Sequence, residues 1–433
     1  MQNILQKNLF VVLLLIYSSS IAQNPTPAPP QSKSILLLNG TAHIGNGTVI
    51  ENAAIGFKNG KITLVADARL IRLASGAFDT TINCSGKHIY PGFIALNTEL
   101  GLREIEMVRA TNDQNETGKY NPSARSVSSY NTDSKVIPTV RNNGVLLAQI
   151  TPGGGTITGT SSVVELDAWN WEDAAYKTDV GAHLNFPSMR IFSSGDAGKD
   201  AEQAERLQKN ISDLKTFFAE SKAYCMSTPV EKNLHFQAMC GLFSGTQKLF
   251  VHCNDAREII TAINLCKDFN MQMVLVGGAD AHHLTQLLKE NNIPVVITRT
   301  QALPHRQDDD INLPYKLPSI LQKAGVEFAI TDGGYWQMRN LPFQAGNAVA
   351  YGITPQQALT SITLSPARIL GISQTTGSIE PQKDATLFIS SGDALDMRGN
   401  NIECAFIRGK QIDLDDVQKQ LYRKYVSKYG LKE

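Results

Sequence analysis

The sequence lacks an excess of charge of either sign. Forty lysines and arginines balance forty aspartates and glutamates over 433 residues, so the formal net charge is zero. Binding to nucleic acid or to an anionic membrane surface is favoured by a basic excess. The composition therefore gives no electrostatic reason to expect either of these partners.

Apolar runs long enough to cross a bilayer are also missing. The run Leu9–Tyr17 has about nine apolar residues, whereas a spanning helix needs about 20. It follows Lys7 and precedes small residues that end at Ala22. This order is typical of a secretory signal peptide over residues 1–22, although a buried N-terminal helix is the alternative. We therefore expect no stable membrane insertion and an exported protein, periplasmic or extracellular, with a proline-rich linker over 23–33.

Paired cysteine motifs are absent as well. Six cysteines are scattered from Cys84 to Cys404, and none belongs to a C-x-x-C pair, so a structural zinc site built on cysteines is not expected. Most of them are expected to be buried thiols. An exported chain permits one or two disulfides, whose pairing the sequence does not fix.

The two ends of the chain are rich in short strand patterns. Near the N-terminus these patterns are joined by glycine turns such as Asn39-Gly40 and Asn59-Gly60, with no helical period between them. Similar patterns return near the C-terminus. We predict that the ends form one discontinuous β-sandwich domain, residues 34–90 with 376–413, followed by a charged amphipathic helix within 414–433.

The centre of the chain, residues 91–375, alternates between apolar strands and amphipathic helices. From Lys248 to Thr331 at least four strand patterns are separated by helical ones, of which Asp255–Phe269 is the clearest. Near-continuous apolar strands with intervening helices favour a parallel sheet covered on both faces, either a barrel or a doubly wound sheet. The stretch Thr111–Asn185 lacks helical periodicity and is predicted to form long loops between early strands.

Four stretches resemble the amidohydrolase superfamily, closest to its secreted, imidazolonepropionase-like branch. They are similar to that family's first, fifth and eighth barrel strands and to its passage from barrel to sandwich. The stretches are Gly86–Ile94, Val251–Asn254, Ile330–Gly333 and the long block Gln357–Leu387. The resemblance spans residues 34–413. It implies an α/β fold, a TIM-like (β/α)8 barrel plus a small β-sandwich, and hydrolysis of carbon–nitrogen bonds.

The resemblance also implies a divalent metal, zinc or manganese, as cofactor. Such a metal lowers the pKa of a bound water while an aspartate accepts its proton, and the ligands lie at the C-terminal strand ends. By resemblance, His252 and Asp332 are metal ligands, Asp332 is the catalytic proton acceptor, and Glu99 is a third ligand. The alternatives are a hydrogen-bonded cleft histidine at 252 and a loop-capping carboxylate at 332.

The sequence departs from the family at two strands. Asn97 and Glu99 hold the positions of the family's paired histidines, and strand alternation is expected to keep them on one face. Asn97 offers only a weakly ligating amide oxygen. The sixth strand ends in glycines at 277 and 278 where the family commonly has another histidine. His282 and His283 follow within a predicted helix, where we expect them to face solvent or to be hydrogen-bonded.

The remaining motifs do not define a site. The segment Gly153–Thr156 lacks the Gly-Lys-Ser/Thr ending of a phosphate loop and is predicted to be a flexible loop near the barrel mouth. The cluster Trp169–Glu172 suits a ligand pocket or core packing equally. A Gly-x-Ser-x-Gly nucleophile elbow is missing, so no motif in the sequence supports a serine hydrolase.

Two functions remain open. The first is a hydrolase of carbon–nitrogen bonds in a small molecule, such as an amide or cyclic amide, with an atypical or reduced metal centre. The second is a catalytically inactive amidohydrolase-fold protein used for binding or assembly. The sequence does not define the substrate, because specificity in this fold lies in loops. It does not define the oligomeric state either, for which a homo-oligomer is one alternative.

Overall fold

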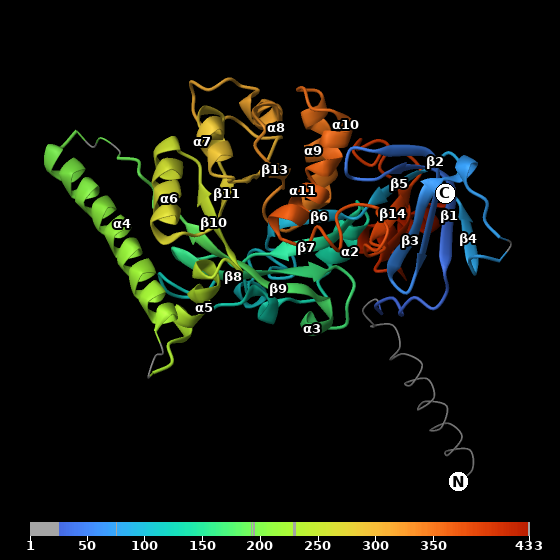
Figure 1. Cartoon of the computed structure of the whole chain (residues 1–433), viewed down its shortest axis with the longest axis horizontal. Coiled ribbons are helices and arrows are strands. Elements are labelled where there is room, and N and C mark those ends of the chain that lie inside the picture. The colour runs from blue at the N-terminus through green and yellow to red at the C-terminus, as the bar shows by residue number, and fades with distance from the viewer. Residues whose placement is uncertain (1–25, 75, 192, 194, 228–230, 432–433) are drawn as a thin grey trace, which may run out of the picture.

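The computed structural model describes residues 26–74, 76–191, 193, 195–227 and 231–431 (Figure 1). The predicted signal peptide lies outside these residues. Two eight-stranded sheets organise the chain, one near the centre of the view in Figure 1 and the other at its right. No helix in the described part of the chain is long and apolar enough to cross a membrane.

The first sheet joins both ends of the chain. Hydrogen bonds link its strands in the order β16-β15-β14-β5-β1-β2-β3, and β4 pairs with β1. The strands are β1 Ile35–His43, β2 Val49–Lys58, β3 Lys61–Asp67, β4 Thr80–Asn83, β5 His88–Pro91, β14 Leu387–Ser390, β15 Ile402–Ile407 and β16 Lys410–Ile412. The N- and C-terminal segments meet where β5 pairs antiparallel with β14.

This sheet curls so that its two halves share a core. Phe57 on β2 and Phe406 on β15 are separated by three strands in the sheet order, yet their ring centroids lie 5.0 Å apart. Ile62 at the start of β3 donates its backbone N–H to the carbonyl of Lys383, just before β14 (2.9 Å). The predicted sandwich is therefore a single curled sheet that packs against itself around a buried apolar cluster.

The second sheet forms a nearly closed barrel in chain order. Its strands are β6 Phe93–Thr98, β7 Val145–Ile150, β8 Ile157–Glu165, β9 Ala175–Asn185, β10 Lys248–Cys253, β11 Met273–Gly277, β12 Val295–Ile297 and β13 Phe328–Ile330. The strands at the two ends of this order, β6 and β13, approach each other. Thr331 Oγ1 donates to the carbonyl of Leu96 (2.5 Å), and Thr98 Oγ1 donates to the carbonyl of Gly334 (2.6 Å).

The barrel departs from a uniform (β/α)8 pattern at β8. This strand pairs antiparallel with both β7 and β9, whereas the other pairs in the sheet are parallel. The expectation of long loops over Thr111–Asn185 is therefore wrong, because β7, β8 and β9 lie within it. The strand β8 was hard to detect because its fully buried residues include Thr158, Thr160, Ser161 and Ser162, so it lacks an apolar pattern.

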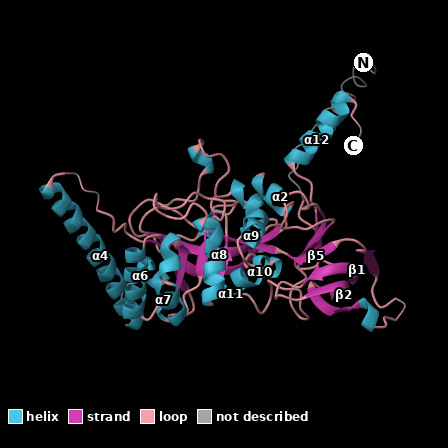
Figure 2. Cartoon of the chain, turned by 90° about the horizontal axis from the view of Figure 1, so that it is seen from above, coloured by secondary structure: helices cyan, strands magenta, loops and turns pink. Residues whose placement is uncertain are grey.

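Helices cover the outside of the barrel, join its later strands and follow the last strand of the first sheet. They are α2 Val136–Arg141, α3 Trp171–Ala174, α4 Ala197–Met226, α5 Leu234–Phe243, α6 Ala256–Phe269, α7 Thr285–Glu290, α8 Leu313–Ala324, α9 Leu341–Val349, α10 Pro355–Thr360, α11 Leu364–Ile369 and α12 Val417–Tyr429. In Figure 2, α4 lies at one end of the molecule and α12 projects from the body.

The helix α6 forms close to where its sequence pattern predicts it. A capping box joins Asp255 and Glu258 at its start, and Asn270 ends it in the left-handed conformation. Its buried face includes Ile259 and Ile263, which pack into the main core. This helix positions Asp255 at the C-terminal end of β10, where the barrel opens.

The cysteines behave largely as expected. Cys84, Cys253 and Cys266 are buried free thiols, and Cys225 forms a disulfide with Cys240. The disulfide joins the last turn of α4 to α5, a pairing that the sequence left open.

A buried ion pair fastens α2 to the end of β8. Arg141 Nη1 lies 2.5 Å from Asp167 Oδ1, and the two side chains are only 5% and 6% exposed. Arg141→Ala leaves the carboxylate of Asp167 buried without its counter-charge, so we expect a loss of about 3–5 kcal/mol in the free energy of unfolding. Urea denaturation followed by circular dichroism measures this loss.

The surface pair Arg398–Asp396, with side chains 89% and 42% exposed, provides the matched control. Arg398→Ala should change the unfolding free energy by less than about 0.5 kcal/mol. Equal losses in the two variants would contradict the structural role given to Arg141.

Candidate functional site

The barrel interior is built in layers that end in a polar layer near the mouth. An apolar layer, which includes Leu147, Val163, Phe250 and Ala329, fills the middle of the barrel. Two residues further along the chain at β7, β10 and β13, toward the C-terminal ends of these strands, the inward residues are polar. The antiparallel strand β8 reaches the same level in the reverse chain direction. The polar residues of this level are Gln149, Ser161, His252 and Thr331, and His183 on β9 joins them.

The polar layer centres on two hydrogen-bonded histidines. His183 Nδ1 lies 2.9 Å from His252 Nε2, and His183 Nε2 lies 2.8 Å from Ser161 Oγ. The His183 ring is fully buried and stacks on Phe250 with centroids 4.7 Å apart, which fixes its plane. Burial lowers the pKa of His252 from 6.5 to about 4, and burial together with the neighbouring His252 places the pKa of His183 well below its usual value. Both rings are therefore neutral at pH 7.

Asp332 lies beyond the end of β13 and is held by two side chains. Its Oδ1 accepts a hydrogen bond from Arg299 Nε (2.6 Å), and its Oδ2 accepts one from Gln344 Nε2 (3.2 Å). The carboxylate is 2% exposed. Burial raises the pKa of Asp332, and the opposing effect of the Arg299 guanidinium does not reverse that direction.

Glu99 and Asn97 lie where the first strand ends. Asn97 adopts a left-handed backbone with φ of 50°, and the pairing of β6 with β7 shifts register between Ala95 and Thr98. Regular strand alternation therefore breaks at this point and does not place Asn97 and Glu99 on one face. The carboxylate of Glu99 accepts a hydrogen bond from Arg103 Nη1 at 2.8 Å.

The expected metal ligands thus have separate partners. Asp332 pairs with Arg299, Glu99 with Arg103, and His252 with His183. Within the described ranges, no group of three or more His, Cys, Asp or Glu side chains is arranged to hold a metal ion. Structural and catalytic zinc sites use at least three protein ligands, so the residues present do not fit the metal centre that the resemblance implies.

The histidines after the sixth strand do not fill the missing position. Residues 279–283 form a 3-10 helix in which His282 Nδ1 lies 3.1 Å from the carbonyl of Ala279, and His283 is exposed. Trp169 is 63% exposed, whereas Trp171 packs partly buried against the core.

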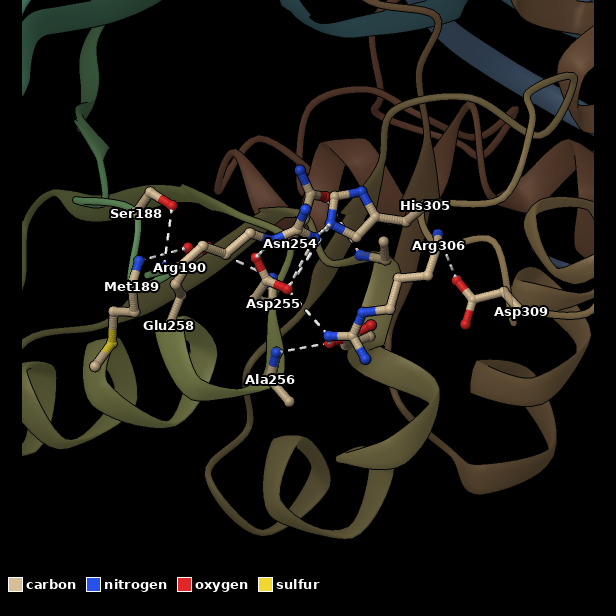
Figure 3. Close-up of polar contacts among 12 residues, drawn as sticks. Ser188, Met189, Arg190, Asn254, Asp255, Ala256, Glu258, His305, Arg306 and Asp309 are labelled. Carbon is tan, nitrogen blue, oxygen red and sulfur yellow. Dashed lines mark hydrogen bonds and ion pairs between the residues drawn. The ribbon is translucent and has the colours of Figure 1, made fainter. Parts of the chain in front are cut away.

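Two arginines, Arg190 and Arg306, meet at Asp255 beyond the C-terminal end of β10 (Figure 3). Arg306, in the loop between β12 and α8, donates to Asp255 (3.0 Å) and to the fully buried Asp280, and Arg190 donates to Asp255 (2.9 Å). The same loop begins with Arg299, which holds Asp332. The hydrogen bonds of Arg299 and Arg306 therefore hold this loop over the C-terminal ends of the strands.

Several residues of this site were not identified from the sequence. His183 and Ser161 lie in the stretch that was assigned to loops, and Asp280 follows the glycines of the sixth strand. The pattern Val180–Leu184 before Asn185 is the signal that could have located β9 and its histidine. The partners Arg299 and Gln344 lie 33 and 12 residues from Asp332, so only the fold brings them together.

The architecture is that of an α/β barrel with polar groups at the C-terminal strand ends, where barrel proteins place their ligand sites. Residues 251–412 match the amidohydrolase family. An imidazolonepropionase from Picrophilus torridus is 25% identical over 365 residues, which cover 80% of this chain and 87% of that protein. The chain is therefore similar to the amidohydrolase family over residues 251–412 and to an imidazolonepropionase over most of its length.

Two further proteins are similar to this chain. Amidohydrolase tasK from Hapsidospora irregularis is 19% identical over 344 residues; the match covers 72% of this chain but only 35% of tasK. The crystal structure of an amidohydrolase from Thermotoga maritima MSB8 has a TM-score of 0.72 at 23% identity and covers 88% of this chain and 99% of that one. The structural likeness confirms the barrel-plus-sheet fold.

The histidine pair makes stability depend on pH. Above pH 6.5 the His252 imidazole is neutral in both folded and unfolded chains; below it, only the unfolded chain gains the proton until pH reaches about 4. Stability therefore falls as pH drops through this window. Between pH 6.5 and 4 the wild-type protein loses free energy of unfolding, and we expect His252→Asn to lose roughly 2 kcal/mol less. Urea unfolding at several pH values measures this difference.

Wild-type protein and the variant should show the same pH dependence above pH 7, which serves as the internal control. His43, whose pKa is also lowered to about 4, mainly by burial, leaves a residual acid sensitivity in the variant. If His252→Asn loses as much free energy of unfolding on acidification as the wild-type protein does, the neutral, buried state of this pair is contradicted.

Proposed function

We propose that this chain is an amidohydrolase-superfamily protein that binds a small molecule at the barrel mouth and has lost the family's metal-dependent hydrolysis. The observation that carries the proposal is the state of Asp332, whose two carboxylate oxygens are taken by Arg299 and Gln344. A charge-assisted bond from a guanidinium is among the stronger hydrogen bonds in proteins. A metal ion would have to displace both partners.

The rest of the expected donor set supports the same proposal. His252 shares its Nε2 with His183, and Asn97 supplies only an amide in place of an imidazole. Glu99 is engaged by Arg103. Displacing these partners exposes unpaired polar groups in a low-dielectric interior, and that cost opposes metal binding.

A second candidate function is a hydrolase of a carbon–nitrogen bond in a small molecule, with a reduced metal centre. One observation favours it: His252 and Asp332 persist at the ends of β10 and β13, inside the segment 251–412 that matches the family. The relative from Picrophilus torridus is an imidazolonepropionase, so a cyclic amide is the substrate class to test first.

Metal content is the first test. The mature protein, purified from cells supplied with zinc or manganese, is expected to hold less than about 0.1 metal ion per chain by elemental analysis, because fewer than three free ligands converge. The triple variant Asn97→His/Glu99→His/Arg299→Ala places an imidazole at each of the two positions and removes the guanidinium from Asp332, and it is expected to bind more metal. Histidine tolerates the left-handed backbone at position 97 better than most residues.

A wild-type protein with one metal ion per chain would overturn the first proposal and favour the second. Turnover distinguishes the two independently: the hydrolase requires metal-dependent cleavage of an amide or cyclic amide that Asp332→Ala abolishes. Arg398→Ala, at an exposed pair in the loop between β14 and β15, serves as the matched control for that variant.

We propose that the protein is exported. The signal-peptide pattern over residues 1–22 and the disulfide Cys225–Cys240 support this, because such bonds persist in oxidising compartments. Expression of the full chain in a bacterial host should give a periplasmic protein that begins at Gln23 and carries this disulfide, as shown by N-terminal sequencing and non-reducing peptide mapping. A cytoplasmic protein that keeps Met1 would contradict the proposal.

A further inference from the structure

The C-terminal helix α12 concentrates positive charge, although the whole chain has a formal net charge of zero. Residues 417–429 include four cations and no aspartate or glutamate, and the cations are Lys419, Arg423, Lys424 and Lys428. In Figure 2 the helix projects from the body of the protein. Of its 13 residues only Val426 is buried, so the rest of the described chain leaves most of this helix uncovered.

Three tyrosines lie on one face of α12. Tyr422, Tyr425 and Tyr429 are spaced by three and four residues, which places their side chains on the same side of a helix. These residues are between 48% and 63% exposed, and Leu421, one turn before Tyr425, is 45% exposed. The rings of Tyr425 and Tyr429 are stacked with centroids 6.3 Å apart. Exposed apolar side chains that gather in this way mark an interaction surface, whereas scattered ones do not.

Lysines border the aromatic face. Lys428 Nζ lies 5.9 Å from the centroid of the Tyr425 ring and 5.2 Å from that of Tyr429. Lys424 precedes Lys428 by four residues, so both ammonium groups lie along the same edge of the face. The stems of such lysines cover apolar surface while their charges reach outward. An aromatic face with lysines along its edge is typical of a helix that lies in the interface of a lipid bilayer.

The first turn of α12 is anchored to α2. Thr139 Oγ1 donates to Gln418 Oε1 (2.8 Å), and Lys419 Nζ donates to Asn142 Oδ1 at the end of α2 (2.8 Å). Asp416 accepts the backbone N–H of Lys419 (2.7 Å) and so caps the helix. The tyrosines lie beyond this anchor, in the later turns, where the helix extends from the body.

A lipid surface complements this face better than a second copy of the helix does. Two α12 helices packed face to face bring the four cations of each together with no acid on either helix, and like charges repel. An anionic bilayer attracts these cations, and its headgroup region accommodates the apolar ring and polar hydroxyl of tyrosine. A helix of 13 residues is about 20 Å long, whereas the hydrocarbon core is about 30 Å thick. The helix therefore suits the bilayer surface and does not span the bilayer.

We propose that α12 binds the surface of an anionic phospholipid bilayer. Tyr422, Tyr425 and Tyr429 lie at the level of the headgroups, and Lys424 and Lys428 face the lipid phosphates. This is reversible, peripheral binding, which holds the barrel next to the membrane without inserting it. The residues involved lie outside the barrel, so lipid binding is independent of the function proposed for the barrel mouth.

Flotation with lipid vesicles tests the proposal on the mature protein. One set of vesicles contains phosphatidylcholine alone, and the other contains equal parts of phosphatidylcholine and phosphatidylglycerol, which is anionic. The protein is expected to float only with the anionic vesicles at low salt. Binding should decrease at an ionic strength of about 1 M, where the Debye length is about 3 Å. A protein that does not float with the anionic vesicles at low salt would overturn the proposal.

Charge-reversal variants assign the binding to α12. Lys424→Glu/Lys428→Glu is expected to lower the partition coefficient by at least about tenfold, because each cation near an anionic surface contributes roughly a factor of five. Lys199→Glu/Lys209→Glu makes the same change of net charge at exposed positions of α4, far from α12 in Figure 2, and should leave binding nearly unchanged. Equal losses in the two variants would show a response to net charge alone and would overturn the role of α12.

The aromatic face is tested in both directions. Replacing Tyr422, Tyr425 and Tyr429 with serine is expected to lower the partition coefficient by at least about fivefold, because the rings supply the apolar area. Replacing the same three residues with tryptophan should raise it, and a folding defect cannot cause such a gain. If neither set of variants changes binding to the anionic vesicles, the tyrosine face is not the lipid-binding surface and the proposal fails.

Sedimentation velocity without lipid distinguishes lipid binding from self-association through the same face. The oligomeric state is expected to be the same for the wild-type protein and the triple serine variant. An oligomer that the serine variant dissociates would show that a second copy covers this face, and it would overturn the proposal.

Discussion

The constraint on which the site depends is that buried polar groups at the barrel mouth must find partners within the protein. The inward residues above the apolar layer are polar on several strands, and an unpaired polar group there costs free energy. The protein satisfies this requirement with a hydrogen-bonded chain from Asn97 through Gln149 and His183 to His252, and with the ion pair between Asp332 and Arg299. The loop between β12 and α8 is held in place by the same ion pair.

Much of the fold could be predicted because it depends on local, repeated signals. Apolar strands and amphipathic helices after Lys248 predicted a parallel sheet in the later half of the barrel, and glycine turns predicted the short strands near the N-terminus. The early half could not be predicted in the same way. The strand β8 carries buried threonines and serines, of which Thr160 and Ser161 donate their hydroxyl protons to backbone carbonyls, so its sequence is similar to that of a loop.

The candidate site was predictable in position but not in chemistry. His252 and Asp332 lie at the strand ends where the resemblance places them, because strand ends follow directly from the strand pattern. Their partners come from distant parts of the chain: His183 is 69 residues from His252, and Arg299 is 33 residues from Asp332. No local pattern links such residues, and the partner decides whether a histidine or a carboxylate is free to act as a ligand.

The ion pair and the hydrogen bonds at the mouth also link strands that a metal centre would otherwise link. The resemblance implies that metal ligands of the family lie on the first, fifth and eighth strands. Here Thr331 and Thr98 connect β6 with the segment after β13, while Arg299 connects that segment with the end of β12. Because these links use only protein groups, the barrel can keep its shape without a shared ion. The residues Asn97 and Glu99 are therefore compatible with retention of the barrel.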